Sequence, residues 1–336
     1  MLDATLLSNA VAAGRIIEQA QPGDPALGPL TQLPGTWENA GDLAGHGWNM
    51  IALPYKLPGN VVNPNVPDQR SDFRLLLNQF NEKLIFSQVD KNVPNRGAAI
   101  ANIFDADQHL AALQYIQHIV QIAAVDFPVT ADNPDRPKGS AAIHHEPGLF
   151  LHLFSRTGGG PDIARLATIP HGDAVLALGN GVMSDGPPDF ENVGDFLPLP
   201  SGVTPDVENN PYLEPYKKFK LAKFKNLFDP TNPLELLKGA VKDIKIKRTT
   251  TITLDTTLAT GGIHNIPFVV KQANATSMRA IFWIEELADK PEIWLQYAQK
   301  VMLDFFPIGG PFGDPDIGRI RWPHISINTM RLTARP

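Results

Sequence analysis

The sequence predicts an all-β protein: an antiparallel β-barrel that carries an N-terminal helix and a long inserted segment. Stretches rich in β-branched and aromatic residues recur along most of the chain, and clusters of Gly, Pro and Asn separate them. The 31 prolines and 27 glycines among 336 residues exceed the ordinary usage of about 12% for the two together, which indicates many turns. No fixed period recurs, so an array of repeats is not expected.

Residues 1–32 are expected to form a short helix and a linker outside the barrel. Apolar side chains from Leu6 to Ile17 recur at helical spacing. The stretch 21–34 is rich in Pro and Gly and ends this pattern. Residues 33–336 are then expected to form a single barrel domain.

Nine stretches of this domain are expected to be strands, because β-branched or aromatic residues dominate them. They are residues 82–89, 110–123, 149–154, 163–169, 174–178, 244–254, 278–286, 294–305 and 320–332. The Ala and Gln residues of 110–123 also suit a helix, which is the alternative there. Its sequence at 113–117, Leu-Gln-Tyr-Ile-Gln, resembles Leu-Gln-Tyr-Ala-Gln at 295–299, and this similarity favours a strand.

Residues 183–247 break the strand pattern and are expected to be an insertion packed outside the barrel. Residues 217–225 hold five lysines with interleaved Phe, which favours a solvated face over membrane contact. Asn232-Pro233-Leu234-Glu235 predicts the start of a helix over 233–241. Asn would cap this helix, Pro suits its first position, and Glu235 would complete a capping box.

The composition excludes several classes of function. A net charge of −6 disfavours a nucleic-acid binder that relies on a basic face. The absence of cysteine excludes thiolate catalysis, Fe–S clusters, Cys-type zinc sites and disulfides. No apolar run reaches the ~18 residues of a spanning helix, and no secretory signal is apparent. We therefore expect a cytoplasmic protein with a small-molecule ligand, no nucleic-acid partner and no transmembrane segment; a homodimer is left open.

A Gly-x-Trp motif at Gly35 and Trp37 marks the start of the barrel domain. In barrels of the calycin type, the Trp of such a motif closes one end of the barrel and the Gly permits close backbone approach. A glycine-rich stretch, Gly-His-Gly-Trp-Asn at 45–49, follows it. Near the other end of the chain, Arg331 is expected to stack on a Trp face.

Two histidine motifs complete the pattern. Residues 144–148 read His-His-Glu-Pro-Gly, which places His144, Glu146 and Gly148 as His-x-Glu-x-Gly, and His324 lies in the last expected strand. With the Gly-x-Trp motif, this combination resembles the nitrobindin family, heme-binding β-barrels that in animals are also fused to a THAP-type zinc finger. The resemblance covers residues 33–60, 81–89, 110–182 and 245–333 in pieces.

The resemblance implies a calycin-like barrel that holds a b-type heme. It implies His324 as the iron ligand, Trp37 and Glu146 as further cofactor-binding residues, and His144 as the catalytic residue on the distal side. The implied chemistry acts on small nitrogen and oxygen species: nitric oxide binding, peroxynitrite isomerisation or weak peroxide reduction. The chain departs from the family pattern in its greater length and in Pro323, which restricts the backbone before His324.

The residues themselves leave alternatives open. His324 can equally be a partly buried strand histidine that bonds a neighbour, and Glu146 can fix the His144 imidazole in a structural group. Two other classes of function remain: an iron-free carrier of a hydrophobic small molecule, and a barrel filled by its own side chains.

Strand alternation adds a consequence that the structure can test. His144 and His145 are adjacent and point to opposite faces, so only one of them enters the barrel. His324 shares its face with Ser326, Asn328 and Met330, whereas Ile325 and Ile327 lie on the other face. If His324 points inward, those isoleucines point outward, and residues 183–247 or the N-terminal helix must cover them.

Overall fold

The computed structural model describes residues 21, 23–54, 73–97, 106–127, 141–153, 160–169, 172–221, 228–267, 273–305 and 320–335. The expected N-terminal helix over 1–21 lies almost wholly outside these residues. Twelve strands occur in the part of the chain that the structure describes. They are β1 (Gly35–Glu38), β2 (Gly47–Pro54), β3 (Phe73–Gly97), β4 (Ala106–Phe127), β5 (Ala141–His152), β6 (Ile163–Ile169), β7 (Asp173–Asp185), β8 (Ile246–Asp255), β9 (Gly262–Asn265), β10 (Ala273–Leu287), β11 (Ile293–Phe305) and β12 (Ile320–Ala334).

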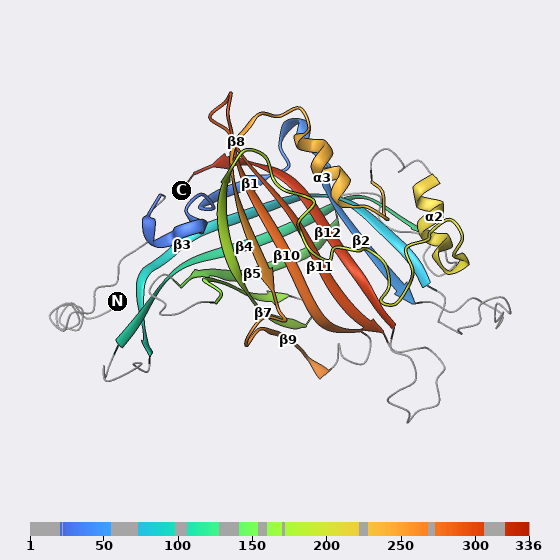
Figure 1. Cartoon of the computed structure of the whole chain (residues 1–336), viewed down its shortest axis with the longest axis horizontal. Helices are drawn as coiled ribbons and strands as arrows, with labels where there is room; N and C mark the ends of the chain where they lie inside the picture. The colour runs from blue at the N-terminus through green and yellow to red at the C-terminus, as the bar shows by residue number, and fades with distance from the viewer. Residues whose placement is uncertain are drawn as a thin grey trace.

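The strands form one closed antiparallel barrel with ten strands around its wall. The path runs from β3 through β4, β5, β6, β7, β8, β10 and β11 to β12. β1 and β2 each pair with both β12 and β3, so their hydrogen bonds close the sheet (Figure 1). The expected all-β barrel is confirmed, and residues 110–123 are strand rather than helix because β4 pairs with β3 and β5 along its length.

A bulge in β4 decides which of its residues face inward. Between Gln79 and Phe80 of β3 the partner on β4 moves from Ala123 to Gln121, so β4 carries an extra residue, which reverses the facing of the residues that follow. On one side of the bulge, Val125 and Phe127 pack against a buried cluster on the outer face of the barrel. On the other side, Leu113 and Tyr115 belong to the cluster inside the barrel.

One end of the barrel is filled by the chain that precedes β1. Leu27, Leu30, Leu33 and Trp37 are all fully buried in the inner cluster, and the short 3₁₀ helix η1 (Pro25–Leu30) carries the first two. The Trp37 Nε1 donates a hydrogen bond to the Leu33 carbonyl at 2.8 Å. Residues 25–32, expected to belong to a linker, are therefore part of the core at this end, which we call the closed end.

Gly35 is required where β1 meets β12. Its φ is +141°, and a Cβ there would lie 2.5 Å from the Ala334 carbonyl oxygen. The expectation that this glycine permits close backbone approach is confirmed. Arg331 also stacks on a tryptophan, with its guanidinium carbon 5.7 Å from the ring centre of Trp294.

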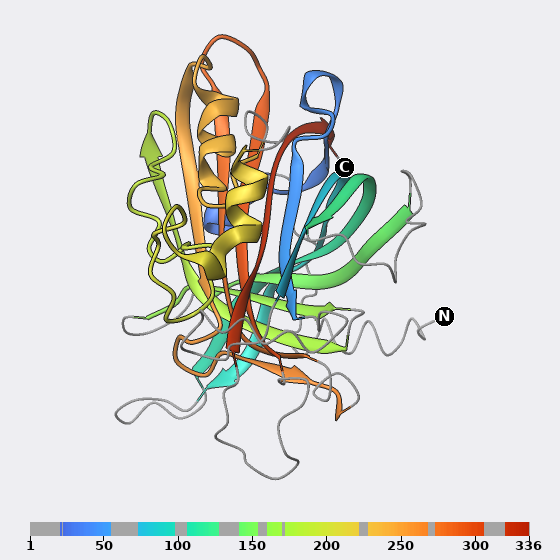
Figure 2. The same ribbon diagram turned by 90° about the vertical axis from the view of Figure 1, so that its right-hand side faces the viewer.

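The chain between β7 and β8 forms an outer layer on one side of the barrel. It contains the helices α2 (Glu214–Leu221) and α3 (Leu234–Val241), together with η3 (Pro211–Leu213); a further short turn, η2 (Gly41–Leu43), follows β1 (Figures 1 and 2). Val193, Phe196 and Leu237 of this layer share one buried cluster with Ile325 and Ile327 of β12. The inserted chain thus covers the outward isoleucines, as an inward His324 requires.

Two details of this layer differ from expectation. α2 was not expected: Tyr216 and Phe219 are buried three residues apart while the lysines between and beside them face out, which is helical spacing. α3 is present, but Pro233 occupies its cap position with no side-chain cap bond. The prediction of a capping box at Asn232 and Glu235 is therefore wrong, and packing rather than a cap stabilises the helix. None of the helices in the described residues is long and apolar enough to cross a membrane.

Candidate functional site

The His-x-Glu-x-Gly motif lies on the inner face of β5. Glu146 is fully buried, and Phe150, on the same face, belongs to the inner cluster. His144 shares this face and is partly buried, whereas His145 is exposed and lies beside His118, with ring centres 6.3 Å apart. Of the two adjacent histidines, the structure brings His144 into the barrel.

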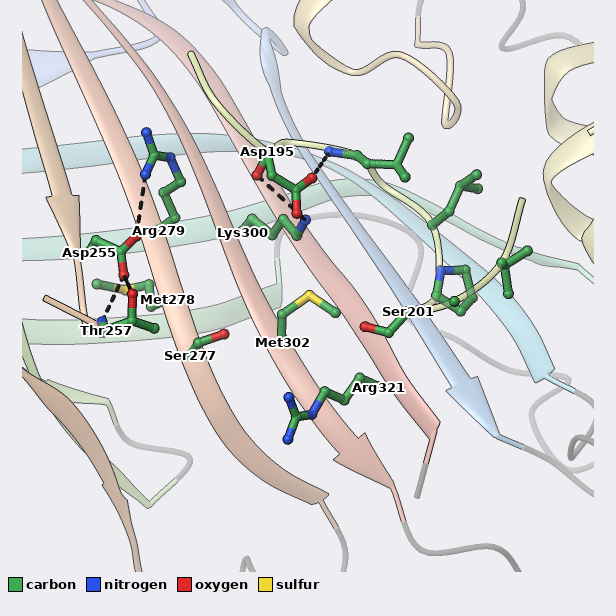
Figure 3. A pocket seen from close by; sticks show the side chains of 15 residues that line it. Asp195, Ser201, Asp255, Thr257, Ser277, Met278, Arg279, Lys300, Met302 and Arg321 are labelled. Atoms are coloured by element: carbon green, nitrogen blue, oxygen red, sulfur yellow. Dashed lines mark hydrogen bonds and ion pairs between the residues drawn. The ribbon is translucent and has the colours of Figure 1, made fainter. Parts of the chain in front are cut away.

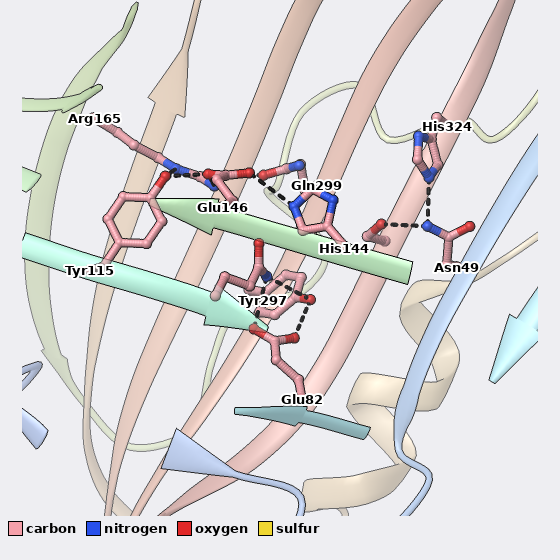
Figure 4. A network of polar contacts seen from close by, with 11 residues as sticks. Asn49, Glu82, Tyr115, His144, Glu146, Arg165, Tyr297, Gln299 and His324 are labelled. Atoms are coloured by element: carbon pink, nitrogen blue, oxygen red, sulfur yellow. Dashed lines mark hydrogen bonds and ion pairs between the residues drawn. The ribbon is translucent and has the colours of Figure 1, made fainter. Parts of the chain in front are cut away.

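Glu146 anchors a buried polar cluster, which we call the Glu146 cluster. Arg165 of β6 contacts Glu146 through Nη2 at 2.6 Å and donates through Nε to the Tyr115 hydroxyl at 3.0 Å. Tyr115 in turn donates its hydroxyl proton to Glu146. The His144 Nε2 lies 3.2 Å from the other Glu146 oxygen, and Arg165 Nη1 donates to Gln299 of β11 at 2.7 Å (Figure 4).

The Glu146 cluster reaches across the barrel. The Arg165 side chain extends from β6 to Gln299 of β11, and β6 and β11 are not neighbours in the wall. The guanidinium also lies over three aromatic rings, 5.3 Å from the centre of Tyr115, 5.8 Å from Phe150 and 5.6 Å from Phe282. The side chain is held on all sides, which is the condition under which a buried charge is tolerated.

Glu146 is ionised at neutral pH. Burial is the largest single influence and acts to raise the pKa of this carboxyl, but the Arg165 charge and the hydrogen bonds to Glu146 together outweigh burial. With the hydrogen bonds from His144 and Tyr115, Arg165 lowers the pKa of Glu146 to about 2. Gly148 makes room for this arrangement, since a Cβ there would lie 2.5 Å from the Tyr115 ring.

A second buried carboxyl, Glu82 of β3, lies in the same layer of the barrel. It accepts hydrogen bonds from Tyr297 at 2.6 Å, Gln117 at 2.8 Å and Asn328 at 2.9 Å. Burial raises the pKa of Glu82 above its ordinary value. These bonds tie β3, β4, β11 and β12 together beside the Glu146 cluster, and we call the two sets together the polar layer.

The polar layer separates two halves of the interior. On one side lies the closed end, with Trp37, Phe86 and Leu30 in the inner cluster. His324 lies on the other side, which we call the open half, and His144, which contacts Glu146 of the polar layer, borders this half. Trp37 pairs with Leu332 on β12, eight residues from His324, and eight residues of strand span about 26 Å. On β5, His144 is likewise eight residues from His152, which contacts the Ala26 carbonyl at the closed end.

His324 faces the open half and is held by Asn49 of β2. The Asn49 Nδ2 lies 2.5 Å from the His324 Nε2 and 3.2 Å from the Ser326 hydroxyl. Asn78 Nδ2 donates to the Asn49 side-chain oxygen Oδ1 at 3.4 Å. With Asn49 as donor, the His324 Nε2 carries no proton, which is the state in which an imidazole nitrogen can bind a metal.

The structure brings only some of the expected site residues together. His144 and Glu146 contact each other, and His324 faces the same open half (Figure 4). Trp37 does not join them, because the polar layer and about 26 Å of strand separate it from His324. Its indole N–H is also already bonded to Leu33.

The sequence analysis missed the side chains that organise the site: Arg165, Tyr115, Glu82, Tyr297 and Gln299. One signal could have found Arg165, since it is the sole charge in the apolar strand β6 and alternates with Ile163 and Ala167. A charge on the inner face of such a strand needs a buried partner. Among the described residues, no group of three or more His, Asp or Glu is placed to hold a metal ion.

Comparisons with known proteins add little to this geometry. No family model matches the chain, and no curated protein sequence matches it either. The chain is similar to the crystal structure of Rv2717c from M. tuberculosis, with 14% sequence identity and a TM-score of 0.36. That similarity covers 92% of this chain and 98% of the other. A TM-score at this level assigns no function.

Proposed function

We propose that the barrel binds a small molecule in its open half, and that this ligand is heme b with His324 as the iron ligand. One observation supports the proposal above the others: two imidazoles, from β5 and β12, face the same half of the interior on one side of the polar layer. The polar layer would limit how deeply the ligand enters, and the closed end would take no part in binding.

The residues of the open half fit such a group. A heme needs a single axial histidine, and the His324 Nε2, which lies 2.5 Å from the Asn49 Nδ2, would be the ligand atom. Ligation would replace the bond from Asn49, a cost of about 1 kcal/mol. Partly buried aliphatic side chains, Ile169, Ile263 and Val301, border the inner cluster and would contact the apolar faces of a porphyrin.

His144 is the residue proposed to act on what the heme binds. A bound heme would supply iron chemistry on small nitrogen or oxygen species, including nitric oxide binding, peroxynitrite isomerisation and weak peroxide reduction. His144 would hold or donate a proton beside the bound species, and Glu146 would keep its ring oriented.

Heme titration into the purified protein tests the proposal. We expect a saturable Soret band near ~400 nm, lost in His324→Ala and restored by added imidazole in His324→Gly. His145→Ala is the matched control, since that ring is exposed on the outer face, and it should bind heme as the wild type does. No saturable spectral change in the wild type would reject heme binding.

The activity is tested separately from binding. His144→Ala should still bind heme, because iron ligation rests on His324. The same variant should lose most of the peroxynitrite or peroxide turnover of the heme-loaded wild type, since a positioned general acid is worth roughly 10²–10⁴-fold. Unchanged turnover would remove His144 from the proposal and leave the binding site in place.

An iron-free carrier is the second candidate, and the partly buried aliphatic residues that border the inner cluster favour it. Burial of an apolar ligand against Ile169, Ile263 and Val301 would contribute about 25 cal/mol per Å² without any metal. Organic extraction of the purified protein followed by mass spectrometry checks this reading. A recovered fatty acid or aromatic compound, together with no Soret band, would favour the carrier.

A further inference from the structure

A cavity of about 420 Å³ lies outside the barrel, between the wall and the inserted chain. Its floor is the outer face of β10, β11 and β12, and residues 195–203 of the inserted chain form its other side (Figure 3). The barrel wall separates it from the open half. The volume falls at the lower end of the roughly 300–1,000 Å³ that small-molecule sites occupy.

Three cationic side chains line this cavity against two carboxylates. The cations are Arg279, Lys300 and Arg321, and the carboxylates are Asp195 and Asp255. Figure 3 shows Lys300 on the floor of the cavity between Asp195 and Met302, with Arg321 beyond Met302. Each cation already has a carboxylate partner, since Arg321 pairs with Asp304, so an anion binds here by replacing one of these carboxylates.

Lys300 is held by a partner that an incoming anion can replace. Its side chain is only 8% exposed, and its Nζ lies 3.0 Å from Asp195 Oδ2. The Asp195 side chain is 76% exposed and belongs to the inserted chain. A buried ammonium needs a counter-ion, but a carboxylate already in water can leave at small cost. An anionic ligand would therefore substitute for Asp195.

The two arginines keep N–H groups available after their protein contacts. Arg279 contacts Asp255 at 3.3 Å and the Val193 carbonyl at 3.1–3.2 Å. Arg321 donates through Nε to Asp304 at 2.9 Å, and its side chain is 56% exposed. A guanidinium has five N–H donors, and its planar fork matches a carboxylate. Arg321 is thus placed to donate hydrogen bonds to a carboxylate ligand at the mouth of the cavity.

Apolar side chains complete the lining. Leu199 and Val203 of the inserted chain are buried, and Met302 lies between the cationic groups. A thioether and two aliphatic groups suit the hydrocarbon part of a ligand and do nothing for an inorganic ion. We infer that this cavity binds a small organic carboxylate, with its anionic group between Lys300 and Arg321 and its apolar part against Met302. This site is independent of the proposed interior function.

Methyl NMR on the full-length protein tests the inference. Methionine methyl groups are labelled with carbon-13, and the Met302 signal is assigned with Met302→Leu. The probe is 4-phenylbutyrate, and 4-phenylbutanol is its neutral match. We expect phenylbutyrate to shift the Met302 signal saturably, phenylbutanol to leave it unmoved, and Arg321→Gln to raise the Kd at least tenfold.

Two variants and inorganic phosphate serve as controls for binding at this cavity. Lys238→Gln removes an exposed lysine of the same inserted chain and should leave the Kd within twofold. His324→Ala should also leave it unchanged, so a failure of the interior site cannot be mistaken for a failure here. An unmoved Met302 signal, equal binding by Arg321→Gln, or a response to inorganic phosphate alone would each overturn the inference.

Discussion

The buried pair of Glu146 and Arg165 shows how a charge can be kept inside a β-barrel. Each of the three guanidinium nitrogens donates to an acceptor, and aromatic rings lie over the group. Removing one partner of such a pair leaves the other as an uncompensated buried charge, whereas removing both does not. The pair therefore stabilises the barrel only as a complete set.

Arg165→Met is expected to lower the free energy of unfolding by about 3–5 kcal/mol, because Glu146 loses its counter-charge. The double variant Arg165→Met, Glu146→Gln should lose less than the sum of the two single variants. Urea unfolding of all four proteins at pH 7 measures the coupling energy. Additive losses would show that the two side chains do not stabilise each other.

The same pair sets the response to acid. The folded pKa of Glu146, about 2, lies below its ordinary value of 4.5, so this contribution to stability is complete above pH 4.5. It is lost as the pH falls from 4.5 toward 2. The double variant lacks this group and should lose less stability than the wild type over that interval.

Glu285 of β10 presents the opposite case. It is fully buried on the outer face of the wall, and neither of its carboxyl oxygens has a hydrogen-bond partner among the described residues. Its cross-strand neighbours are Thr249 and Trp294, which carry no charge. Burial raises the pKa of Glu285 to about 8.

This carboxyl is expected to make the protein less stable as the pH rises. The folded state keeps its proton between pH 4.5 and about 8 while the unfolded state loses it, so stability falls by up to about 1.4 kcal/mol per pH unit. Glu285→Gln should remove this slope and be the more stable protein at pH 8. Urea unfolding at pH 5, 6.5 and 8 measures it. The control is Glu286→Gln, which changes the adjacent carboxylate, a partly exposed group paired with Arg248.

At the scale of the element, β5 shows why a glycine ends the His-x-Glu-x-Gly motif. A Cβ at position 148 would collide with the Leu166 carbonyl oxygen of β6 and lie 2.5 Å from the Tyr115 ring. The backbone oxygen cannot move without breaking the pairing of β5 with β6. The glycine is therefore what lets Tyr115 lie against the strand and reach Glu146.

Gly148→Ala is expected to cost at least about 1–3 kcal/mol, the range for overpacking a core, and to displace Tyr115. Gly239→Ala is the matched control, because it lies in α3 with nothing within 4 Å of a new Cβ. That change should stabilise the protein by about 0.5–1 kcal/mol through helix propensity. Thermal unfolding of both variants checks the contrast, and an equal effect would contradict it.

Alternation predicted which side chains of β5 and β12 share a face, but it predicted neither which face points inward nor the pairings between distant residues. It places His324 and Ile325 on opposite faces of β12, and the choice of face depends on the inserted chain that covers Ile325. Arg165 meets Gln299 across 134 positions, and this contact exists only because the barrel closes. The composition of 21–34 indicated turns correctly but could not show that Leu27 and Leu30 fill the closed end.

At the scale of the molecule, the closed end stabilises the fold, and the open half is where we propose that the ligand binds. Trp37 is expected to serve stability alone, because about 26 Å of strand separate it from His324. Trp37→Phe removes the bond to Leu33 and some buried area, which should lower the free energy of unfolding by about 1–3 kcal/mol.

Ligand titration of Trp37→Phe distinguishes a role in stability alone from a role in cofactor binding. Heme, or whichever hydrophobic ligand the open half takes, should bind this variant within twofold of the wild type. A loss of affinity with no loss of stability would return Trp37 to the binding site.

The polar layer also bears on how such a protein can change over evolution or by design. Side chains of the open half are not neighbours of those that fill the closed end. Substitutions in the two sets are therefore expected to have nearly additive effects on stability. New ligand specificities could then arise by substitution in the open half, while the closed end keeps the chain folded. A library of variants at the inward-facing positions of β2, β5 and β12, on the open-half side of Glu146 and Asn328, would test this with few substitutions.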